Sequence, residues 1–257
     1  MKKDLFDLGI EGKIFIISGA SGDIGLAIAK KLKKYGGIVH GCDLKSPKEI
    51  SYFDTFKVFD ATNIDFVKEF VESKVNVGLD CVICCAGIAG EVVDAEDVTT
   101  ELFQTTINVS LLSSALFVKF ATPYFKKSRK GEFILFSSTA GVRGTSLMPA
   151  YSAAKHGIIG LTRSYARELG PWGIRVNALL PGLIDSEMAI SIHSSLQARV
   201  SSNIPQNKLP TDASAHIPLK RIGTSKDVAH AVLFLTSSMA DYISCCMLNV
   251  DGGVLSK

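Results

Sequence analysis

The sequence predicts an α/β protein, in which one domain over residues 1–257 is built on a doubly wound parallel sheet of about seven strands. Short apolar runs rich in β-branched residues alternate with amphipathic helical stretches, which is the pattern of repeated strand–helix–strand units. The connections between parallel strands are right-handed, so such repeats place helices on both faces of the sheet. A chain of 257 residues, 47% of them hydrophobic, suits one domain with a sizeable core.

The individual elements follow from their patterns. Seven strands are expected, over residues 13–17, 38–42, 56–59, 79–85, 133–136, 175–180 and 247–250. Helical patterns cover residues 26–32, 63–75, 100–127 and 226–237, and a further helix follows Pro149 and runs to about Leu169. The segment between the second and third strands is short and polar, so any crossover helix there is stunted. Residues 188–218 are polar, Ser-rich and irregular, with one modest helical patch. Because a loop this long is usually functional, we expect it to be a substrate lid.

The charge and hydropathy of the chain restrict its partners. A formal charge of +3 on a mixed surface gives no reason to expect a nucleic acid or a membrane as partner. No apolar run approaches the roughly 20 residues that span a bilayer. The charged start of the chain is not followed by the apolar core of a signal peptide. We therefore expect a cytoplasmic protein that acts on a small molecule.

Six cysteines require a decision between metal ligands, disulfides and core thiols. Cys81 and Cys84 lie three apart on a predicted strand, hence on opposite faces, so they cannot hold one metal together. Cys84 and Cys85 are adjacent, as are Cys245 and Cys246, and neither pair has the spacer of a zinc site. Core thiols in a reducing compartment are the favoured interpretation, and no metal is expected.

A glycine-rich turn joins the first predicted strand to the first helix. Its sequence is Ser18-Gly19-Ala20-Ser21-Gly22-Asp23-Ile24-Gly25. Glycines let a backbone approach a pyrophosphate, and the helix that follows offers free N–H groups and a positive dipole end. This strand–turn–helix context favours a Rossmann-type dinucleotide site.

Asp43 ends the second predicted strand, at about the 20-residue distance where an acidic residue meets the adenosine ribose. A carboxylate there accepts hydrogen bonds from the free 2′-hydroxyl and repels a 2′-phosphate. NAD is therefore preferred over NADP, although the neighbouring Lys45 leaves room for Asp43 as an ordinary loop residue.

Tyr151 and Lys155 are four residues apart on a predicted helix, so they share one face. A phenol has an ordinary pKa of about 10, and an ammonium one turn away stabilises the phenolate. The pair can therefore exchange a proton with an alcohol or a carbonyl.

Taken together, these motifs resemble those of the short-chain dehydrogenase/reductases over nearly the full length of the chain. The turn from Ser18 to Gly25 stands for the family's Thr-Gly-x-x-x-Gly-x-Gly. The other matching segments, in the family's order, are Asp60-Ala61-Thr62, Cys84-Cys85-Ala86-Gly87, Asn108-Val109, Ser138, Tyr151-x-x-x-Lys155 and Pro181-Gly182-x-Ile184-x-Ser186.

The resemblance implies a role for each matching residue. Tyr151 would be the general acid/base, Lys155 would bind the nicotinamide ribose, and Ser138 would bind the substrate oxygen. Asn108 would hold a water in the proton relay. The implied cofactor-binding residues are Gly19, Ser21, Asp23, Ile24, Gly25, Asp43, Asp60, Ala61, Cys85, Ala86, Gly87, Tyr151, Lys155, Pro181, Gly182, Ile184 and Ser186.

Three departures from the family pattern stand out. Asp23 replaces the middle glycine of the turn and brings a carboxylate close to the pyrophosphate site. Cys84 and Cys85 replace two asparagines that tie neighbouring strands together. Ser244-Cys245 replaces a Thr-Gly before the last strand, which affects the local backbone.

The resulting hypothesis is an NAD(H)-dependent oxidoreductase that interconverts a secondary alcohol and a ketone. The first alternative is an NADPH-dependent 3-oxoacyl-[acyl-carrier-protein] reductase, and residues 217–235 also resemble the tail of 2,3-dihydro-2,3-dihydroxybenzoate dehydrogenases. A non-catalytic dinucleotide-binding scaffold is the alternative from another class. The resemblance also implies a homotetramer or homodimer.

Overall fold

The fold is described by a computed structural model that covers residues 7–75, 77–200 and 213–256. Seven parallel strands form one sheet in the order β3-β2-β1-β4-β5-β6-β9. They are β1 (Ile14–Ser18), β2 (Ile38–Asp43), β3 (Thr55–Val58), β4 (Leu79–Cys84), β5 (Gly131–Phe136), β6 (Ile174–Pro181) and β9 (Met247–Val250). The strand order reverses between β1 and β4, which is the switch point of a doubly wound sheet. The predicted fold class is confirmed.

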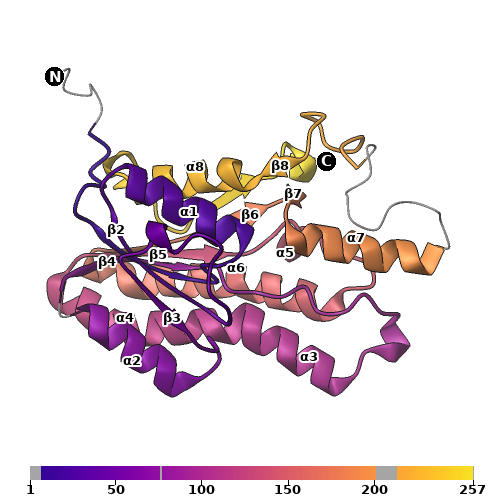
Figure 1. The fold of residues 1–257 in the computed structure, drawn as a ribbon, viewed down its shortest axis with the longest axis horizontal. Coiled ribbons are helices and arrows are strands. Elements are labelled where there is room, and N and C mark those ends of the chain that lie inside the picture. The colour runs from indigo at the N-terminus through magenta and orange to yellow at the C-terminus, as the bar shows by residue number, and fades with distance from the viewer. Residues whose placement is uncertain (1–6, 76, 201–212, 257) are drawn as a thin grey trace.

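Helices cover both faces of this sheet (Figure 1). One face carries α1 (Asp23–Lys34) and α8 (Ser225–Thr236), and the other carries α2 (Ile64–Val75), α4 (Ser113–Ser128) and α6 (Pro149–Leu169). Short 3-10 helices occur at Ile50–Tyr52, Ala95–Asp97, Gly170–Trp172, Ser238–Ala240 and Val254–Ser256. The first of these is the whole helical content of the β2–β3 connection, as its short polar sequence predicts.

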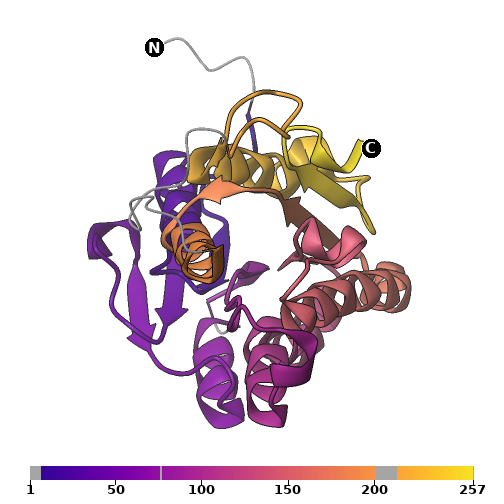
Figure 2. The ribbon, with the colours of Figure 1, turned by 90° about the vertical axis from the view of Figure 1, so that its right-hand side faces the viewer.

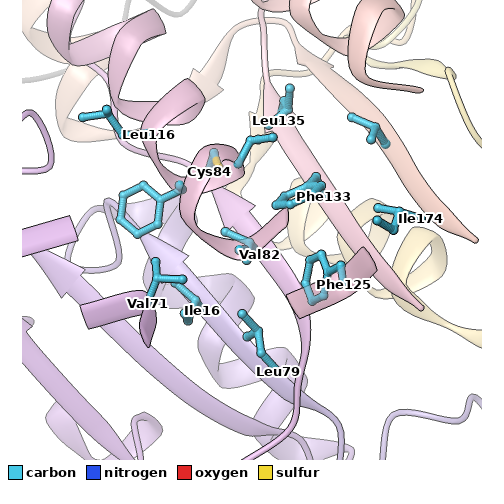
Figure 3. Packing of buried hydrophobic residues seen from close by; sticks show 14 of the residues in the cluster. Ile16, Val71, Leu79, Val82, Cys84, Leu116, Phe125, Phe133, Leu135 and Ile174 are labelled. Atoms are coloured by element: carbon cyan, nitrogen blue, oxygen red, sulfur yellow. The ribbon is translucent and has the colours of Figure 1, made fainter. Parts of the chain in front are cut away.

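The core consists of two main clusters, one on each face of the sheet. Figure 3 shows the cluster under α2, α4 and α6, where Phe125 and Phe133 pack edge to face with ring centroids 5.1 Å apart. Cys84 belongs to this cluster, whereas Cys81 belongs to the cluster under α1 and α8. The predicted separation of these two thiols is confirmed, and all six cysteines are free.

The long predicted helix over residues 100–127 is interrupted. It consists of α3 (Thr100–Ile107), a π-helical turn at Asn108–Leu112, and α4. By length and composition alone, this run of 29 residues could cross a membrane, since an 18-residue window within it has a mean hydropathy of 1.2. However, α4 contributes Phe117, Val118, Ala121 and Phe125 to the core cluster, so the run is a core helix in this fold.

Three features differ from the sequence prediction. Helix α7 (Glu187–Val200) is a full 14-residue helix, where the sequence suggested only a modest helical patch. A short helix α5 (Ala140–Arg143) follows β5, and β7 (Ile184–Asp185) pairs with β8 (Gly223–Thr224) in a small second sheet. Two- and four-residue elements are too short to show a periodic pattern. The part of the predicted lid at residues 201–212 lies outside the described residues.

Candidate active site

Two adjoining cavities lie at the carboxyl ends of the parallel strands. One has a volume of about 360 Å³ and is lined by the glycine-rich turn, Asp43 and Asp60. The other has a volume of about 410 Å³ and is lined by Ser138, Tyr151 and Lys155. Both cavities share the residues Ile24, Cys85, Gly87, Ser186 and Met188. We call them the turn cavity and the tyrosine cavity.

The predicted cofactor residues are distributed over these two cavities. The turn cavity is lined by Gly19, Ser21, Asp23, Ile24, Gly25, Asp43, Asp60, Ala61, Cys85, Ala86, Gly87 and Ser186. The tyrosine cavity is lined by Tyr151, Lys155, Pro181, Gly182 and Ile184 in addition to the shared residues. The structure therefore brings the whole predicted set together, although its members are spread over residues 19–186 of the chain.

The geometry of the turn requires glycine. Gly19 has a φ of +68°, and a Cβ on it would lie 2.7 Å from the backbone of Ala86. The turn therefore packs directly against the chain that leaves β4. Helix α1 begins at Asp23 with Gly22 as its N-cap, and no side chain caps its first N–H groups. Its positive end remains available for an anion.

The turn cavity fits the pyrophosphate part of a dinucleotide. The hydroxyl of Ser21 is buried there and has no hydrogen-bond partner within the described residues. An unpartnered buried hydroxyl costs free energy, and a phosphate oxygen would satisfy it. Ser21, the turn backbone and the N-terminus of α1 would hold the pyrophosphate.

Asp43 is held in place at the end of β2. Its Oδ2 accepts a hydrogen bond from the Ser21 N–H at 3.0 Å, and its Oδ1 accepts one from the Leu44 N–H at 2.7 Å. The carboxylate thus lies on the wall of the turn cavity, next to the turn. This is where an adenosine ribose would meet it.

Asp23 has a structural partner in α7. Its Oδ2 accepts a hydrogen bond from the Glu187 N–H at 2.8 Å, at the first residue of α7. Glu187 Oε1 lies 2.8 Å from Lys48 Nζ, and its Oε2 lies 3.6 Å from Lys45 Nζ. Figure 2 shows α7 nearly end-on beside the N-terminal half of the molecule. We call Asp23, Glu187, Lys45 and Lys48 the α7 anchor.

Tyr151 and Lys155 lie one turn apart on α6, as predicted. Lys155 is only 5% exposed, and its Nζ donates a hydrogen bond to the Phe136 carbonyl at 2.8 Å. The same nitrogen lies 5.5 Å from the centroid of the Tyr151 ring. The Tyr151 hydroxyl is hydrogen-bonded to Ser138 at the end of β5. The proton-transfer group and its hydroxyl partner therefore come from adjacent elements.

The electrostatics of this pair differ from the expectation. Burial raises the pKa of Tyr151, and the hydrogen bond with Ser138 offsets only part of this rise. Lys155 does not depress the pKa of Tyr151 in the protein alone, because the buried amine loses its proton at a lower pH than the phenol does. Burial also lowers the pKa of Lys155 to about 8.

Asn108 is the catalytic candidate that the structure does not bring to the site. Its side chain is exposed at the start of the π-helical turn and lines neither cavity. Ser110 is buried instead, and its hydroxyl accepts a hydrogen bond from the Ile88 N–H at 3.0 Å and donates one to the Ile88 carbonyl at 2.9 Å. Two residues turn a regular helix by about 200°, which explains why one side chain faces outward and the other inward.

Ser110 is thus a site residue that the sequence reasoning missed. A Cβ built on Gly87 would lie 3.4 Å from both Ser110 Oγ and Lys155 Nζ. Ser110 therefore pins the Gly87–Ile88 backbone, which forms part of the cavity wall beside Lys155. The sequence carried no signal for this role, since serine is common in helices with no partner.

The other departures from the family pattern are accommodated by local packing and backbone hydrogen bonds. The Cys84 thiol is buried 3.9 Å from the Ser114 carbonyl, and the Cys85 N–H donates to the Ser18 carbonyl at 3.2 Å. Backbone bonds and packing thus replace the expected side-chain ties between strands. Cys245 has a φ of +64°, a region that favours the glycine it replaces.

The wall contributed by α7 was also missed. Met188, Ala189, Ile192, His193 and Leu196 line the tyrosine cavity. These positions recur at spacings of four, which places them on one face of the helix. This periodicity was present in the sequence but was obscured by the polar serines around it.

Comparison with known proteins agrees with this geometry. A family model described as enoyl-(acyl carrier protein) reductase matches residues 19–255. The 3-oxoacyl-[acyl-carrier-protein] reductase of Thermotoga maritima is 30% identical over 96% of this chain and 99% of its own length.

Solved structures share the whole fold. The aldohexose dehydrogenase of Thermoplasma acidophilum superimposes with a TM-score of 0.88 at 30% identity, covering 97% of this chain and 96% of its own. A structure of ElxO with NADPH bound has a TM-score of 0.83 at 26% identity, covering 96% and 100%. Matched over almost its full length by a family model and by these relatives, the chain belongs to the short-chain dehydrogenase/reductase family of oxidoreductases.

Proposed function

We propose that the protein is an NAD(H)-dependent oxidoreductase that interconverts a secondary alcohol and a ketone. The observation that carries this proposal is the meeting of Ser138, Tyr151 and Lys155 at a cavity that adjoins the turn cavity. A substrate in the tyrosine cavity would lie between a proton-transfer group and the site of the dinucleotide. Oxidoreduction of a carbinol needs this arrangement.

Ser21, Asp43 and the glycine-rich turn would hold a nicotinamide dinucleotide, which would supply the chemistry of hydride transfer. Tyr151 takes the alcohol proton in oxidation and returns it in reduction, at its phenolic oxygen. Ser138 holds the substrate oxygen and shares a hydrogen bond with Tyr151. Lys155 stands beside the ring of Tyr151 and, when protonated, supplies positive charge to the site. Helix α7 acts as the lid that limits the entry of water.

The preference for NAD rests on the Asp43 carboxylate in the turn cavity. The principal alternative is an NADPH-dependent 3-oxoacyl-[acyl-carrier-protein] reductase. It is favoured by the name of the Thermotoga maritima relative and by the NADPH bound to ElxO. The two differ in the cofactor and in the size of the substrate.

The test is turnover with NADH and with NADPH on simple ketones, on sugars, on cyclic diols and on a 3-oxoacyl thioester, followed by absorbance of the reduced cofactor. We expect NADH-linked activity on a small carbonyl compound, and a loss of at least a thousandfold in Tyr151→Phe. Strong NADPH preference with activity only on the thioester would support the reductase alternative, and oxidation confined to cyclic diols would support the diol dehydrogenase. Dinucleotide binding without any turnover would support a scaffold.

The location and assembly of the protein belong to the same proposal. Six free cysteines, including the exposed Cys245, suit the reducing cytoplasm. We also propose a homotetramer or homodimer. Leu112 and Phe103 of the α3–α4 run are 44% and 38% exposed, and such apolar side chains are suited to a contact between subunits. Light scattering measures the number of subunits.

A further inference from the structure

The wall that α7 gives to the tyrosine cavity is apolar except at one position. Met188, Ala189, Ile192 and Leu196 surround His193 on the inner face of the helix. Among the described residues, Tyr151, Lys155 and Cys85 are the other titratable side chains that line this cavity, and burial raises the pKa of the Cys85 thiol to about 12. His193 is therefore the ionisable group on the lid side that remains without a role.

The Nε2 atom of His193 is buried and has no hydrogen-bond partner within the described residues. A buried polar atom left in this state costs about 1–3 kcal/mol, so native proteins retain few of them without a reason. The described residues contain four such side-chain atoms, which are Nε2 of His193, Nε2 of His40, the hydroxyl of Ser21 in the lining of the turn cavity, and Glu132 Oε1, which forms an ion pair instead of a hydrogen bond. Each of the two cavities is thus lined by one residue that carries an unpartnered polar atom.

The remainder of the lining restricts the ligand. Among the described residues, no Asp, Glu or Arg side chain lines the tyrosine cavity, and its hydroxyl groups come from Ser137, Ser138, Thr139, Thr145, Tyr151 and Ser186. A polyol or a polyanion would leave most of its polar groups unmatched on the apolar α7 face. A cavity of about 410 Å³ suits a compact molecule with an apolar body.

We infer that the substrate is a compact ketone or secondary alcohol that carries a second oxygen function, which forms a hydrogen bond with His193. This inference rests on the proposed function and names the substrate class of the same site. Tyr151 and Ser138 bind the reacting oxygen, and His193 binds the second oxygen through Nε2. His193 is a specificity-determining residue that acts on binding and takes no proton from the reacting centre.

The experiment compares ketones that differ only at the far end of the chain. The five-carbon set is pentan-2-one, 5-hydroxypentan-2-one and 4-oxopentanoate, and longer homologues with the same end groups vary the distance between the two functions. The wild-type enzyme is expected to have a KM at least tenfold lower for an oxygenated member than for the matching plain ketone. Comparison of the KM for the hydroxyl compound with the KM for the carboxylate compound shows whether the site prefers a neutral or an anionic second function.

Variants of His193 connect this preference to the imidazole. We expect His193→Phe to raise the KM of the preferred oxygenated substrate at least tenfold. Its kcat for that substrate, and its kcat and KM for the plain ketone, should stay within about twofold of the wild-type values. His193→Gln keeps polar atoms at a similar reach and is expected to recover part of the loss. Ser195→Ala, at an exposed position of α7 outside the cavity lining, controls for changes in the helix and should leave the selectivity unchanged.

The outcomes separate this inference from the proposed function. If the wild type reduces none of the ketones and behaves like Tyr151→Phe, the proposed function fails. If it reduces them without preference for the oxygenated members, or if His193→Phe affects all of them equally, the proposed function stands and the role of His193 is overturned.

Discussion

At the scale of single residues, the composition of the site depends on which side chain of the α3–α4 run faces the cavities. Asn108 and Ser110 are both polar, and the motif in the sequence pointed to Asn108. The structure places Asn108 at the surface and Ser110 in hydrogen bonds with both backbone groups of Ile88. Their spacing predicts that the two side chains face opposite ways, but it does not predict which of them faces the site.

Separate substitutions of Ser110 and Asn108 give the first prediction. Ser110→Ala leaves the Ile88 N–H and carbonyl without their partner and frees the wall beside Lys155, so kcat/KM should fall at least tenfold. Ser110→Thr keeps the hydroxyl and should recover most of this activity, which separates positioning from a general loss of stability. Asn108→Ala is expected to remain within about twofold of wild type. Steady-state kinetics on all three variants measure these changes in kcat/KM, and thermal unfolding shows whether each variant remains folded. A large loss of kcat/KM in Asn108→Ala alone would restore the catalytic role first expected for Asn108.

Asp43 gives a second prediction at this scale, for the choice of cofactor. Asp43→Asn removes the negative charge but keeps an oxygen that can accept the Ser21 N–H. Since one charge close to a phosphate is worth a few kcal/mol at a protein surface, we expect the NADPH/NADH ratio of kcat/KM to rise about tenfold or more. Asp60→Asn, at another carboxylate that lines the turn cavity, is the matched control and should leave this ratio unchanged. An unchanged ratio in Asp43→Asn would remove the argument for NAD.

At the scale of elements, α7 shows what a sequence pattern can and cannot predict. The strands were predictable because buried parallel strands are continuous apolar runs, and their ends differ from expectation by only one or two residues. Helix α7 was underestimated because polar serines lie between its apolar positions in the sequence. Its position was not predictable at all, since it depends on a hydrogen bond between Asp23 and Glu187, 164 residues apart.

The α7 anchor predicts a salt-dependent release of the dinucleotide. Ser186 and Met188, on either side of Glu187, line both cavities, so the start of α7 crosses the region where the two parts of a dinucleotide would join. Glu187→Gln removes the ion pairs with Lys45 and Lys48, which are exposed and therefore worth under about 1 kcal/mol each. We expect the rate of dinucleotide release, measured by stopped-flow fluorescence, to rise about two- to fivefold.

Ionic strength provides the control for this prediction. In the wild type, salt should screen the same ion pairs and accelerate release, whereas Glu187→Gln should respond much less. Glu69→Gln, an exposed substitution on α2, should behave like wild type. Equal salt dependence in wild type and Glu187→Gln would show that the anchor does not restrain α7.

At the scale of the whole molecule, alternation of apolar runs with amphipathic helices was sufficient to predict the doubly wound sheet. The convergence of the site follows from that topology, because parallel strands deliver the residues after their carboxyl ends to one edge. The ion pair at the opposite edge of the sheet, where the strands begin, was not predictable from these patterns. There, Glu132 at the start of β5 is 5% exposed and forms an ion pair with Arg175 of β6 at 2.9 Å.

The Glu132–Arg175 pair makes the stability of the fold depend on pH. Burial raises the pKa of Glu132 from 4.5 to about 7, although Arg175 and Lys13 act in the opposite direction. A carboxyl with a raised pKa in the folded state binds its proton more tightly there than in the unfolded chain. Its contribution to stability is therefore fully present below pH 4.5 and is lost as the pH rises through 7.

Glu132→Gln tests this dependence directly. Between pH 5 and pH 8, we expect the free energy of unfolding of the wild type to fall relative to the variant by up to about 3 kcal/mol. Arg175 retains hydrogen bonds to the Ile243 and Leu235 carbonyls in the variant, so the comparison does not leave a bare guanidinium. The buried His40, whose pKa is lowered to about 4, gives an opposite slope below pH 6.5 that is common to both proteins and cancels in the difference. Urea unfolding at each pH measures the two profiles, with Glu101→Gln on the exposed start of α3 as the control. Parallel profiles for the wild type and Glu132→Gln would mean that Glu132 remains ionised in the fold, and that its pairing with Arg175 outweighs its burial.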